Sequence, residues 1–185
     1  IAIERMAVAL LFCPTETAVN NLKAEGISKG VHNVGDVMYD VSLFYRDRAR
    51  QQSIIQETLK LVQGGFALTT CHRAENTDDP KRLGEILSAL AIVARHLPVV
   101  LPLHPRTRKL IGEYGLSHHL AALIVTEPLP FLDMVALEQA ARLILTDSGG
   151  VQKEAFFYSV PCITMRDETE WVETVDLGWN RLVGA

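Results

Sequence analysis

The chain has 185 residues and a mass of 20.5 kDa, which corresponds to about one domain and a further piece. Hydrophobic residues make up 48% and charged residues 22% of the chain, and this balance excludes a disordered protein, a coiled coil and a fibrous repeat. The formal net charge of −4 argues against a nucleic-acid partner, because duplex binding needs a basic face. No apolar run reaches the length of about 18 residues that a membrane span needs, so no membrane partner is expected.

The cysteine and histidine spacings point away from metal sites and disulfides. Cys13, Cys71 and Cys162 are odd in number and far apart, with no C-x-x-C pair, and no H-E-x-x-H sequence occurs. We therefore expect buried, reduced thiols, a cytoplasmic location, and neither a metal nor a cofactor.

The first third of the chain contains two short strand patterns and several helical ones. A strand and a helix are predicted over residues 10–26, a second short strand over 31–34, and one or two helices from Val37 to about Leu61. The Gly64-Gly65 pair breaks this pattern and marks the predicted boundary between residues 1–63 and residues 64–185. Because the chain starts and stops inside patterned segments, we expect a fragment of a larger polypeptide.

From Gly64 onward, apolar runs and helical patterns alternate at regular spacing. Strands are predicted over residues 66–70, 99–103, 123–126, 143–146 and 162–165, and another begins near residue 180. Helices are predicted to begin at Pro80, Thr107, Phe131, Val151 and Thr169. The strands are almost wholly apolar, as expected where both faces of a sheet are covered. The alternation predicts an α/β fold with an open, doubly wound, mostly parallel sheet.

Polar residues follow four of these strands, at the edge where such sheets bind ligands. The four loops read CHRAEN from residue 71, HPRT from residue 104, TDSGG from residue 146 and RDETE from residue 166. Gly149 and Gly150 let a ligand approach the backbone closely, and the next helix offers free N–H groups and a positive dipole end. A phosphate fits this position, with Arg73 and Arg106 as bidentate donors. Glu154, about one turn further along, is suited to accept hydrogen bonds from two ribose hydroxyls.

Each of these features has a structural alternative. The glycine pair also fits a tight turn, Glu154 a solvated helix face, and the residues from 166 to 168 a surface cluster of ion pairs. Glu75 and Asn76 alternatively brace their loop. Trp171 and Trp179 are expected to pack rather than to stack on a ligand, and Met134 and Leu137 are expected in the core.

The ordered set of motifs resembles the non-hydrolysing UDP-N-acetylglucosamine 2-epimerases. The matching stretches run over residues 72–76, 104–107, 146–155, 161–170 and 178–184. The match as a whole extends from the region of residues 12–16, through Gly35-Asp36, to the last residue. The resemblance implies a Rossmann-like sheet that forms half of a glycosyltransferase-B-like, two-domain fold. Residues 1–63 would be a remnant of the N-terminal Rossmann-like domain with connecting helices. Residues 64–185 would be the C-terminal UDP-binding domain, truncated at its C-terminus.

The resemblance also implies the site residues. His72 and Arg73 would stabilise the leaving diphosphate during catalysis, while the acid and base carboxylates would come from the missing N-terminal domain. Ser148, Gly149 and Gly150 would bind phosphate. The other implied substrate-binding residues are Glu75, Asn76, His104, Arg106, Met134 beside the uracil, Glu154 and Arg166.

The implied reaction interconverts UDP-GlcNAc and UDP-ManNAc by elimination and re-addition of UDP. We expect the fragment to bind UDP without turnover and the full-length parent to be a homodimer. Three alternatives stay open at this point: an epimerase acting on a UDP-2,3-diacetamido uronic acid, the donor-binding domain of a UDP-sugar glycosyltransferase, and a non-catalytic nucleotide-binding module.

Overall fold

The computed structural model describes residues 10–184, which divide into two compact units. The first unit extends to Leu43 and the second begins at Phe44. In the first unit, strands β1 (Leu11–Cys13) and β2 (Val31–Asn33) pair in parallel and are connected through helix α1 (Glu16–Ala24). The backbone N–H of Ala18 donates to Thr15 Oγ1 at 3.2 Å, so Thr15 caps α1.

The division between the units falls inside helix α2 (Val37–Gln52), well before the glycine pair that predicted the boundary. The end of α2 and helix α3 (Ile55–Thr58) join the core of the second unit, where Ala49 and Ile55 are buried. Apolar packing therefore sets the edge of this unit, and the glycines lie within it. The assignment of residues 1–63 to a remnant of another domain stays a prediction.

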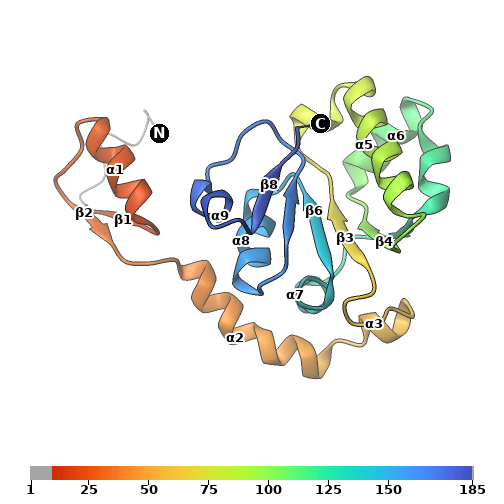
Figure 1. Cartoon of the computed structure of the whole chain (residues 1–185), viewed down its shortest axis with the longest axis horizontal. Coiled ribbons are helices and arrows are strands. Elements are labelled where there is room, and N and C mark those ends of the chain that lie inside the picture. Colours follow the sequence, from red (N-terminus) through yellow and green to blue (C-terminus); the bar gives the residue numbers. More distant parts are fainter. Residues whose placement is uncertain (1–9, 185) are drawn as a thin grey trace. The chain divides into compact units, whose positions relative to one another are not determined.

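The second unit is built on a six-stranded parallel sheet with strand order β5-β4-β3-β6-β7-β8 (Figure 1). The doubly wound, parallel sheet expected from the apolar runs is confirmed. The strands are β3 (Ala67–Thr70), β4 (Val99–Pro102), β5 (Ile124–Thr126), β6 (Leu143–Thr146), β7 (Cys162–Thr164) and β8 (Asn180–Leu182).

The helices of this unit differ from expectation mainly near the loops that follow strands. Helix α8 begins two residues earlier than expected and α9 three residues later, while α4 and η2 were not predicted. No helix in the described range 10–184 is long and apolar enough to cross a membrane. The helices are α4 (Ala74–Thr77), α5 (Pro80–Val93), α6 (Pro105–Glu113), the 3₁₀ helix η2 (Ser117–Ala122), α7 (Phe131–Ala140), α8 (Gly149–Phe157) and α9 (Val172–Asp176).

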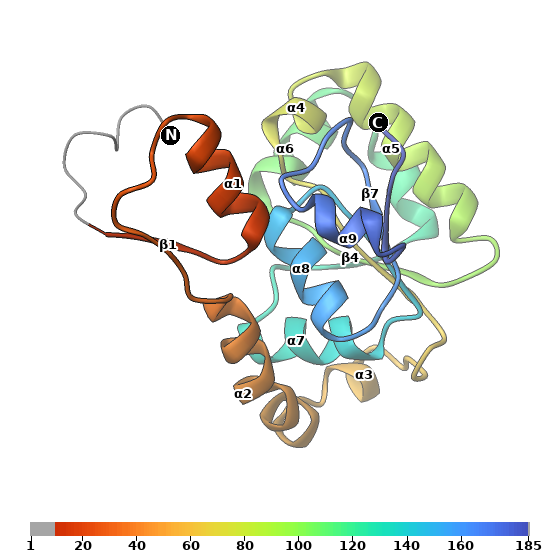
Figure 2. The same cartoon turned by 60° about the vertical axis from the view of Figure 1, so that its left-hand side comes forward.

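Helices cover both faces of the sheet, and each face buries its own apolar cluster. Helices α8 and α9 lie on one side of the sheet and α5 and α6 on the other (Figures 1 and 2). Leu68 and Ile144 point to the cluster shared with α7 and α8, whereas Leu101 and Leu145 point to the cluster shared with α5 and α6. Alternate residues of one strand thus serve opposite faces, which explains why the strands are apolar throughout.

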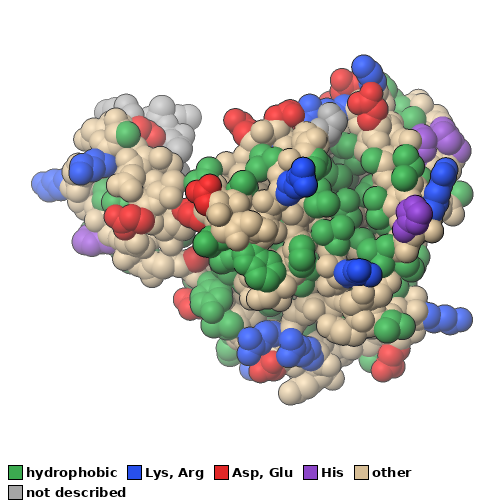
Figure 3. Space-filling view, in the orientation of Figure 1, with side chains coloured by type: hydrophobic (Ala, Val, Ile, Leu, Met, Phe, Trp, Pro, Cys, Tyr) green, Lys and Arg blue, Asp and Glu red, His purple; other side chains and the backbone are tan. Residues whose placement is uncertain are grey.

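An apolar groove of about 350 Å³ remains open between α5 and the strands β7 and β8. Figure 3 shows hydrophobic side chains gathered on this side of the sheet. The lining residues are Glu85, Ile86, Ala89, Leu90, Val93, Leu145, Ile163, Met165, Val183 and Gly184. The groove is almost wholly apolar, unlike the polar edge described next.

Candidate functional site

The polar loops meet where the direction of winding reverses. From β3 the chain moves outward through β4 to β5, and then returns to β6 on the other side of β3. The loops after β3 and β6 therefore diverge at the same edge, which is the usual position of a ligand site in this kind of sheet. Thr70 and Thr146 end these strands as register partners, and their hydroxyl oxygens are 2.6 Å apart. This pairing aligns residues 71–77 with residues 147–152.

Asp147 assembles the loop that follows β3. It is fully buried, and its Oδ2 accepts hydrogen bonds from the backbone N–H groups of His72 and Arg73, both at 2.9 Å. The same oxygen accepts from Asn76 Nδ2 at 3.3 Å, and Oδ1 lies 3.5 Å from Nδ1 of the His72 ring. The carboxylate thus fixes the backbone from which His72 and Arg73 project. The motif analysis included Asp147 but gave it no role, because only the sheet topology shows what lies opposite it.

Asn76, one of the expected substrate-binding residues, braces this loop from inside the protein. It is fully buried, and its Nδ2 also donates to the carbonyl oxygen of Met165 at 2.9 Å. Its Oδ1 accepts from Nε of Arg82 at 2.9 Å. Both ends of the amide are therefore engaged inside the protein, and the bracing alternative holds for this residue.

The glycine pair forms the first turn of α8. Neither glycine has a positive φ, so the pair is not there to allow a left-handed turn. Instead, a Cβ on Gly149 would collide with Oε1 of Glu170 and would lie 3.2 Å from Nε1 of Trp171. In the described chain the Ser148 hydroxyl does not cap the helix, although the Ser148 N–H donates to Thr146 Oγ1 at 2.9 Å. The missing Cβ of Gly149 thus lets the Glu170 side chain approach the positive end of the helix closely.

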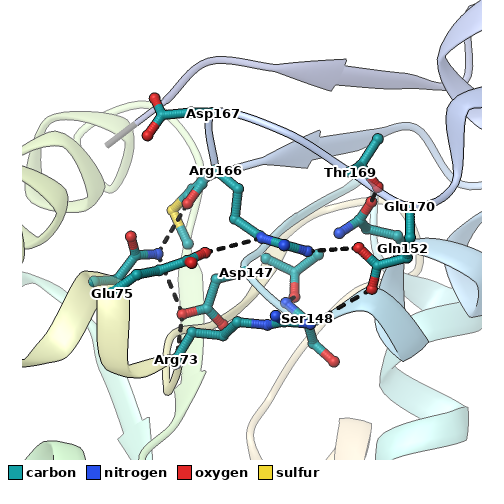
Figure 4. A network of polar contacts seen from close by, with 12 residues as sticks. Arg73, Glu75, Asp147, Ser148, Gln152, Arg166, Asp167, Thr169 and Glu170 are labelled. Atoms are coloured by element: carbon teal, nitrogen blue, oxygen red, sulfur yellow. Dashed lines mark hydrogen bonds and ion pairs between the residues drawn. The ribbon is translucent and has the colours of Figure 1, made fainter. Parts of the chain in front are cut away.

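A network of arginines and glutamates lies over this end of α8 (Figure 4). Arg166 is buried, and its Nε donates to Glu75 Oε1 while Nη1 donates to Glu170 Oε2, both at 2.9 Å. Arg73 Nη2 lies 3.5 Å from Glu170 Oε1. The structure therefore brings Arg73, Glu75 and Arg166 together beside Ser148 (Figure 4). Arg166 belongs to a buried network, so the alternative of a surface ion-pair cluster does not hold for it.

The charges of this network stabilise one another against the cost of burial. Burial opposes the charged form of Arg166, but its bonds and charge interactions with Glu170 and Glu75 outweigh that cost and raise its pKa. Burial likewise opposes ionisation of Glu170, but its own backbone N–H, Arg166 and Arg73 outweigh it and lower the pKa of this carboxyl. Glu170 is thus an anion resting against the positive end of α8. Its role was not expected from the sequence.

The loop after β4 reaches the same edge but uses its polar groups locally. His104 Nδ1 accepts from the backbone N–H of Arg106 at 3.2 Å and so caps α6. Arg106 donates through Nη1 to Thr77 Oγ1 at 2.7 Å and pairs through Nη2 with Asp78. Arg106, the second arginine expected to bind phosphate, is therefore already paired with a carboxylate, that of Asp78.

Two glutamates lie together on α7 and α8. Burial raises the pKa of Glu154 to about 7, and the nearby Lys153 opposes this shift only in part. Burial and the charge of Glu154 raise the pKa of Glu138 well above its usual range. Glu138 is 2% exposed, and its burial was not expected, because a glutamate on a helix usually faces solvent. Met134, also on α7, is half-buried and packs against the apolar cluster.

The three cysteines are free and buried, as expected. Cys71 lies beside the site. Its pKa is raised well above the ordinary thiol value, chiefly by burial and to a smaller extent by the charge and hydrogen bond of Asp147. It is therefore a protonated packing residue and not a reactive thiolate.

The fold and its polar switch point define the class of this protein as a Rossmann-like domain, and comparisons with known proteins give the family. The model of the family described as UDP-N-acetylglucosamine 2-epimerase matches residues 1–185, and the chain belongs to this family. The resemblance inferred from the motifs is thereby confirmed. So is the expected architecture, half of a glycosyltransferase-B-like fold.

Solved structures of relatives include ligand complexes. The UDP-GlcNAc 2-epimerase of Methanocaldococcus jannaschii, in complex with UDP-GlcNAc and UDP, superposes with a TM-score of 0.88 at 40% identity, covering 95% of this chain and 50% of that one. The UDP-GlcNAc 2-epimerase of Neisseria meningitidis, bound to UDP-GlcNAc, superposes with a TM-score of 0.80 at 32% identity, covering 95% of this chain and 49% of that one.

A relative that is named for another substrate is more similar in sequence. The UDP-2,3-diacetamido-2,3-dideoxy-D-glucuronate 2-epimerase of Pseudomonas aeruginosa is 52% identical over 180 residues, or 95% of this chain and 49% of the relative. The chain thus spans about half the length of the relatives it matches.

Proposed function

We propose that this chain is the UDP-binding portion of a UDP-sugar 2-epimerase. The observation that carries the proposal is the positive end of α8 at the switch point, where Gly149 lets an anionic group, here the Glu170 carboxylate, approach closely and Arg73 and Arg166 lie alongside. A diphosphate is the ligand that such a constellation suits best, because backbone N–H groups and guanidinium groups both favour its charge.

In this proposal each part of UDP meets a different element. The diphosphate lies on Ser148, Gly149 and Gly150 at the start of α8, within reach of His72 and Arg73. Glu154, one turn further along the same helix, accepts hydrogen bonds from the ribose hydroxyls. The uracil lies beside Met134 on α7, where a thioether offers a soft apolar contact.

The proposed reaction inverts C2 of the sugar in two steps. Loss of the C2 proton and departure of UDP from C1 give a glycal, and UDP then adds back to C1 while a proton reaches the opposite face of C2. Negative charge grows on the leaving diphosphate, and preorganised donors stabilise it. This chain supplies those donors in our proposal, whereas the groups that move the C2 proton belong to the remainder of the protein.

Two sugars are candidates. UDP-GlcNAc, interconverted with UDP-ManNAc, is the first, because several relatives carry that enzyme's name. A UDP-2,3-diacetamido uronic acid is the second, because the relative at 52% identity is named for it. Both share the UDP and the 2-acetamido group, so the site described above serves either.

Calorimetric titration of the 185-residue chain with UDP tests the binding proposal. Arg73→Ala and Glu154→Gln should each weaken UDP binding about tenfold, since each removes a hydrogen bond to or from a charged group. Lys109→Ala is the control, because Lys109 is exposed and, among the described residues, forms an ion pair along α6 with Glu113, at 3.6 Å. Unchanged affinity in both site variants would show that the pocket assignment is wrong.

The reaction is tested with the full-length protein in heavy water, by following the C2 proton of each candidate UDP-sugar by NMR. Deuterium incorporation at C2 with formation of the epimer is expected, and the 185-residue chain alone should show neither. Sugar transfer that requires an added acceptor would instead indicate a glycosyltransferase, and epimerisation by this chain alone would refute the placement of the acid and base groups elsewhere.

A further inference from the structure

Trp171 carries a hydrogen-bond donor that the described chain does not use. Its Nε1 is buried, and no group within residues 10–184 accepts a hydrogen bond from it. This nitrogen lies 3.2 Å from the position that a Cβ on Gly149 would occupy, at the start of α8. Buried indole N–H groups usually have an acceptor, because leaving one unpaired costs free energy. An acceptor supplied by a ligand at this point would remove that cost.

The contacts of Trp171 hold the ring by its backbone and by one face, and they leave the N–H edge unused. Nζ of Lys153 lies 4.0 Å from the centre of the indole ring, in a cation–π contact. The backbone N–H of Trp171 donates to Thr169 Oγ1 at 3.1 Å, and that hydroxyl donates to Gln152 Oε1 at 2.6 Å. The ring is thus held from α8 itself, and a base stacked on the occupied face is excluded.

The space in front of the indole N–H holds a carboxylate in this structure. Oε1 of Glu170 lies at the same Cβ position of Gly149, yet it does not accept from the indole. Glu170 is held there by Arg166 and Arg73 (Figure 4). An anion is therefore tolerated beside the indole, and a phosphate oxygen has the same charge and the same preference for N–H donors.

We propose that the indole N–H of Trp171 donates a hydrogen bond to the diphosphate of the bound nucleotide, whose phosphate oxygen takes the place of the Glu170 carboxylate. This inference rests on the proposed UDP site and adds Trp171 to it as a binding residue. Recognition is then of phosphate and not of uracil or sugar. Displacement of Glu170 also releases Arg73 from its ion pair toward the same phosphate.

Trp171→Phe tests the proposal, because phenylalanine keeps an aromatic ring and lacks the N–H. The variant should bind UDP about tenfold more weakly, the change expected for one hydrogen bond to a charged group, and should bind uridine like the parent chain. Trp179→Phe is the matched control, since Trp179 contacts Phe156 edge-on at 6.5 Å between ring centres. UDP affinity equal in both variants and the parent would overturn the proposal.

The indole N–H signals give a second readout that does not depend on the folding of Trp171→Phe. The chain has two tryptophans, so its ¹⁵N–¹H spectrum contains two indole signals, which Trp179→Phe assigns. The Trp171 signal should move downfield on saturation with UDP and stay in place with uridine. A signal that does not move although calorimetry shows UDP bound would overturn the role of Trp171 alone. Absence of UDP binding by the parent chain would overturn the proposed function and this inference together.

Discussion

Replacing Asp147 by asparagine removes the charge on which the loop after β3 is assembled. The side chain keeps its shape and retains one oxygen that can accept from the backbone N–H groups of His72 and Arg73, now at 2.9 Å. What changes is the strength of those bonds, because a hydrogen bond to a carboxylate is stronger than one to a neutral amide. The new amide NH₂ also takes the place of a buried carboxylate oxygen, Oδ1, which lies 3.5 Å from Nδ1 of the His72 ring.

The magnitude follows from the three donors on Oδ2, two from backbone and one from Asn76. A bond to a charged group contributes about 1.5–3 kcal/mol and a neutral one about 1 kcal/mol, so three weakened bonds remove up to several kcal/mol. Asparagine is cheaper to bury than a carboxylate, which offsets part of this loss. We expect a net destabilisation of about 2 kcal/mol, which lowers the urea midpoint by about 1 M.

Urea unfolding followed by circular dichroism measures this loss in the 185-residue chain. The control is Asp79→Asn, which makes the same substitution at an exposed carboxylate that accepts from the backbone N–H groups of Lys81 and Arg82. Asp79 is the N-cap of α5, where asparagine is equally suitable, so its midpoint should hardly change. If Asp147→Asn unfolds at the same urea concentration as this control, the buried carboxylate does not organise the loop.

Three further results follow from the same structure. Gly149→Ala should change the free energy of unfolding by less than about 1 kcal/mol in urea, because alanine favours the helix and the Glu170 side chain can move aside. The same variant should bind UDP about tenfold more weakly in calorimetry. Unaltered affinity would contradict the placement of the phosphate. UDP affinity of the parent should rise relative to Glu154→Gln as the pH increases through about 7, where Glu154 ionises; parallel pH profiles would refute its role at the ribose. The pKa of Glu154 in the folded protein lies above the ordinary value of 4.5, so the stability that its protonated form contributes is fully present below pH 4.5 and is lost as pH rises through about 7. The urea midpoint of the parent should therefore fall over this pH range, and that of Glu154→Gln should lack this fall.

The sheet was predictable because five of its six strands lie in apolar runs that end in polar residues, whereas β8 has the sequence NRL. Helix α5 was predictable for a similar reason, since Pro80 marks its start and apolar residues recur at helical spacing. Helix α4 was not, because four residues of the sequence AENT carry no apolar periodicity. This turn forms where Asp147 fixes the backbone just before it, and that contact joins residues more than 70 positions apart.

The site was predictable to the extent that it lies in loops after strands. The residues missed are those whose role depends on a long-range neighbour. The sequence does not show that the face of α7 that carries Glu138 is buried, or that Glu170 lies against Gly149. Helix α8 was expected to begin at Val151, because glycine is a poor helix former. It begins at Gly149, where the absence of a Cβ makes room for Glu170.

A crystal structure of the chain with UDP tests the central claim most directly. We predict both phosphates within hydrogen-bond distance of the first turn of α8, with the Glu170 carboxylate moved away from Gly149 and the Arg73 guanidinium turned toward phosphate. UDP bound in the apolar groove beside α5, or at any position that leaves Glu170 in place over Gly149, would contradict the account.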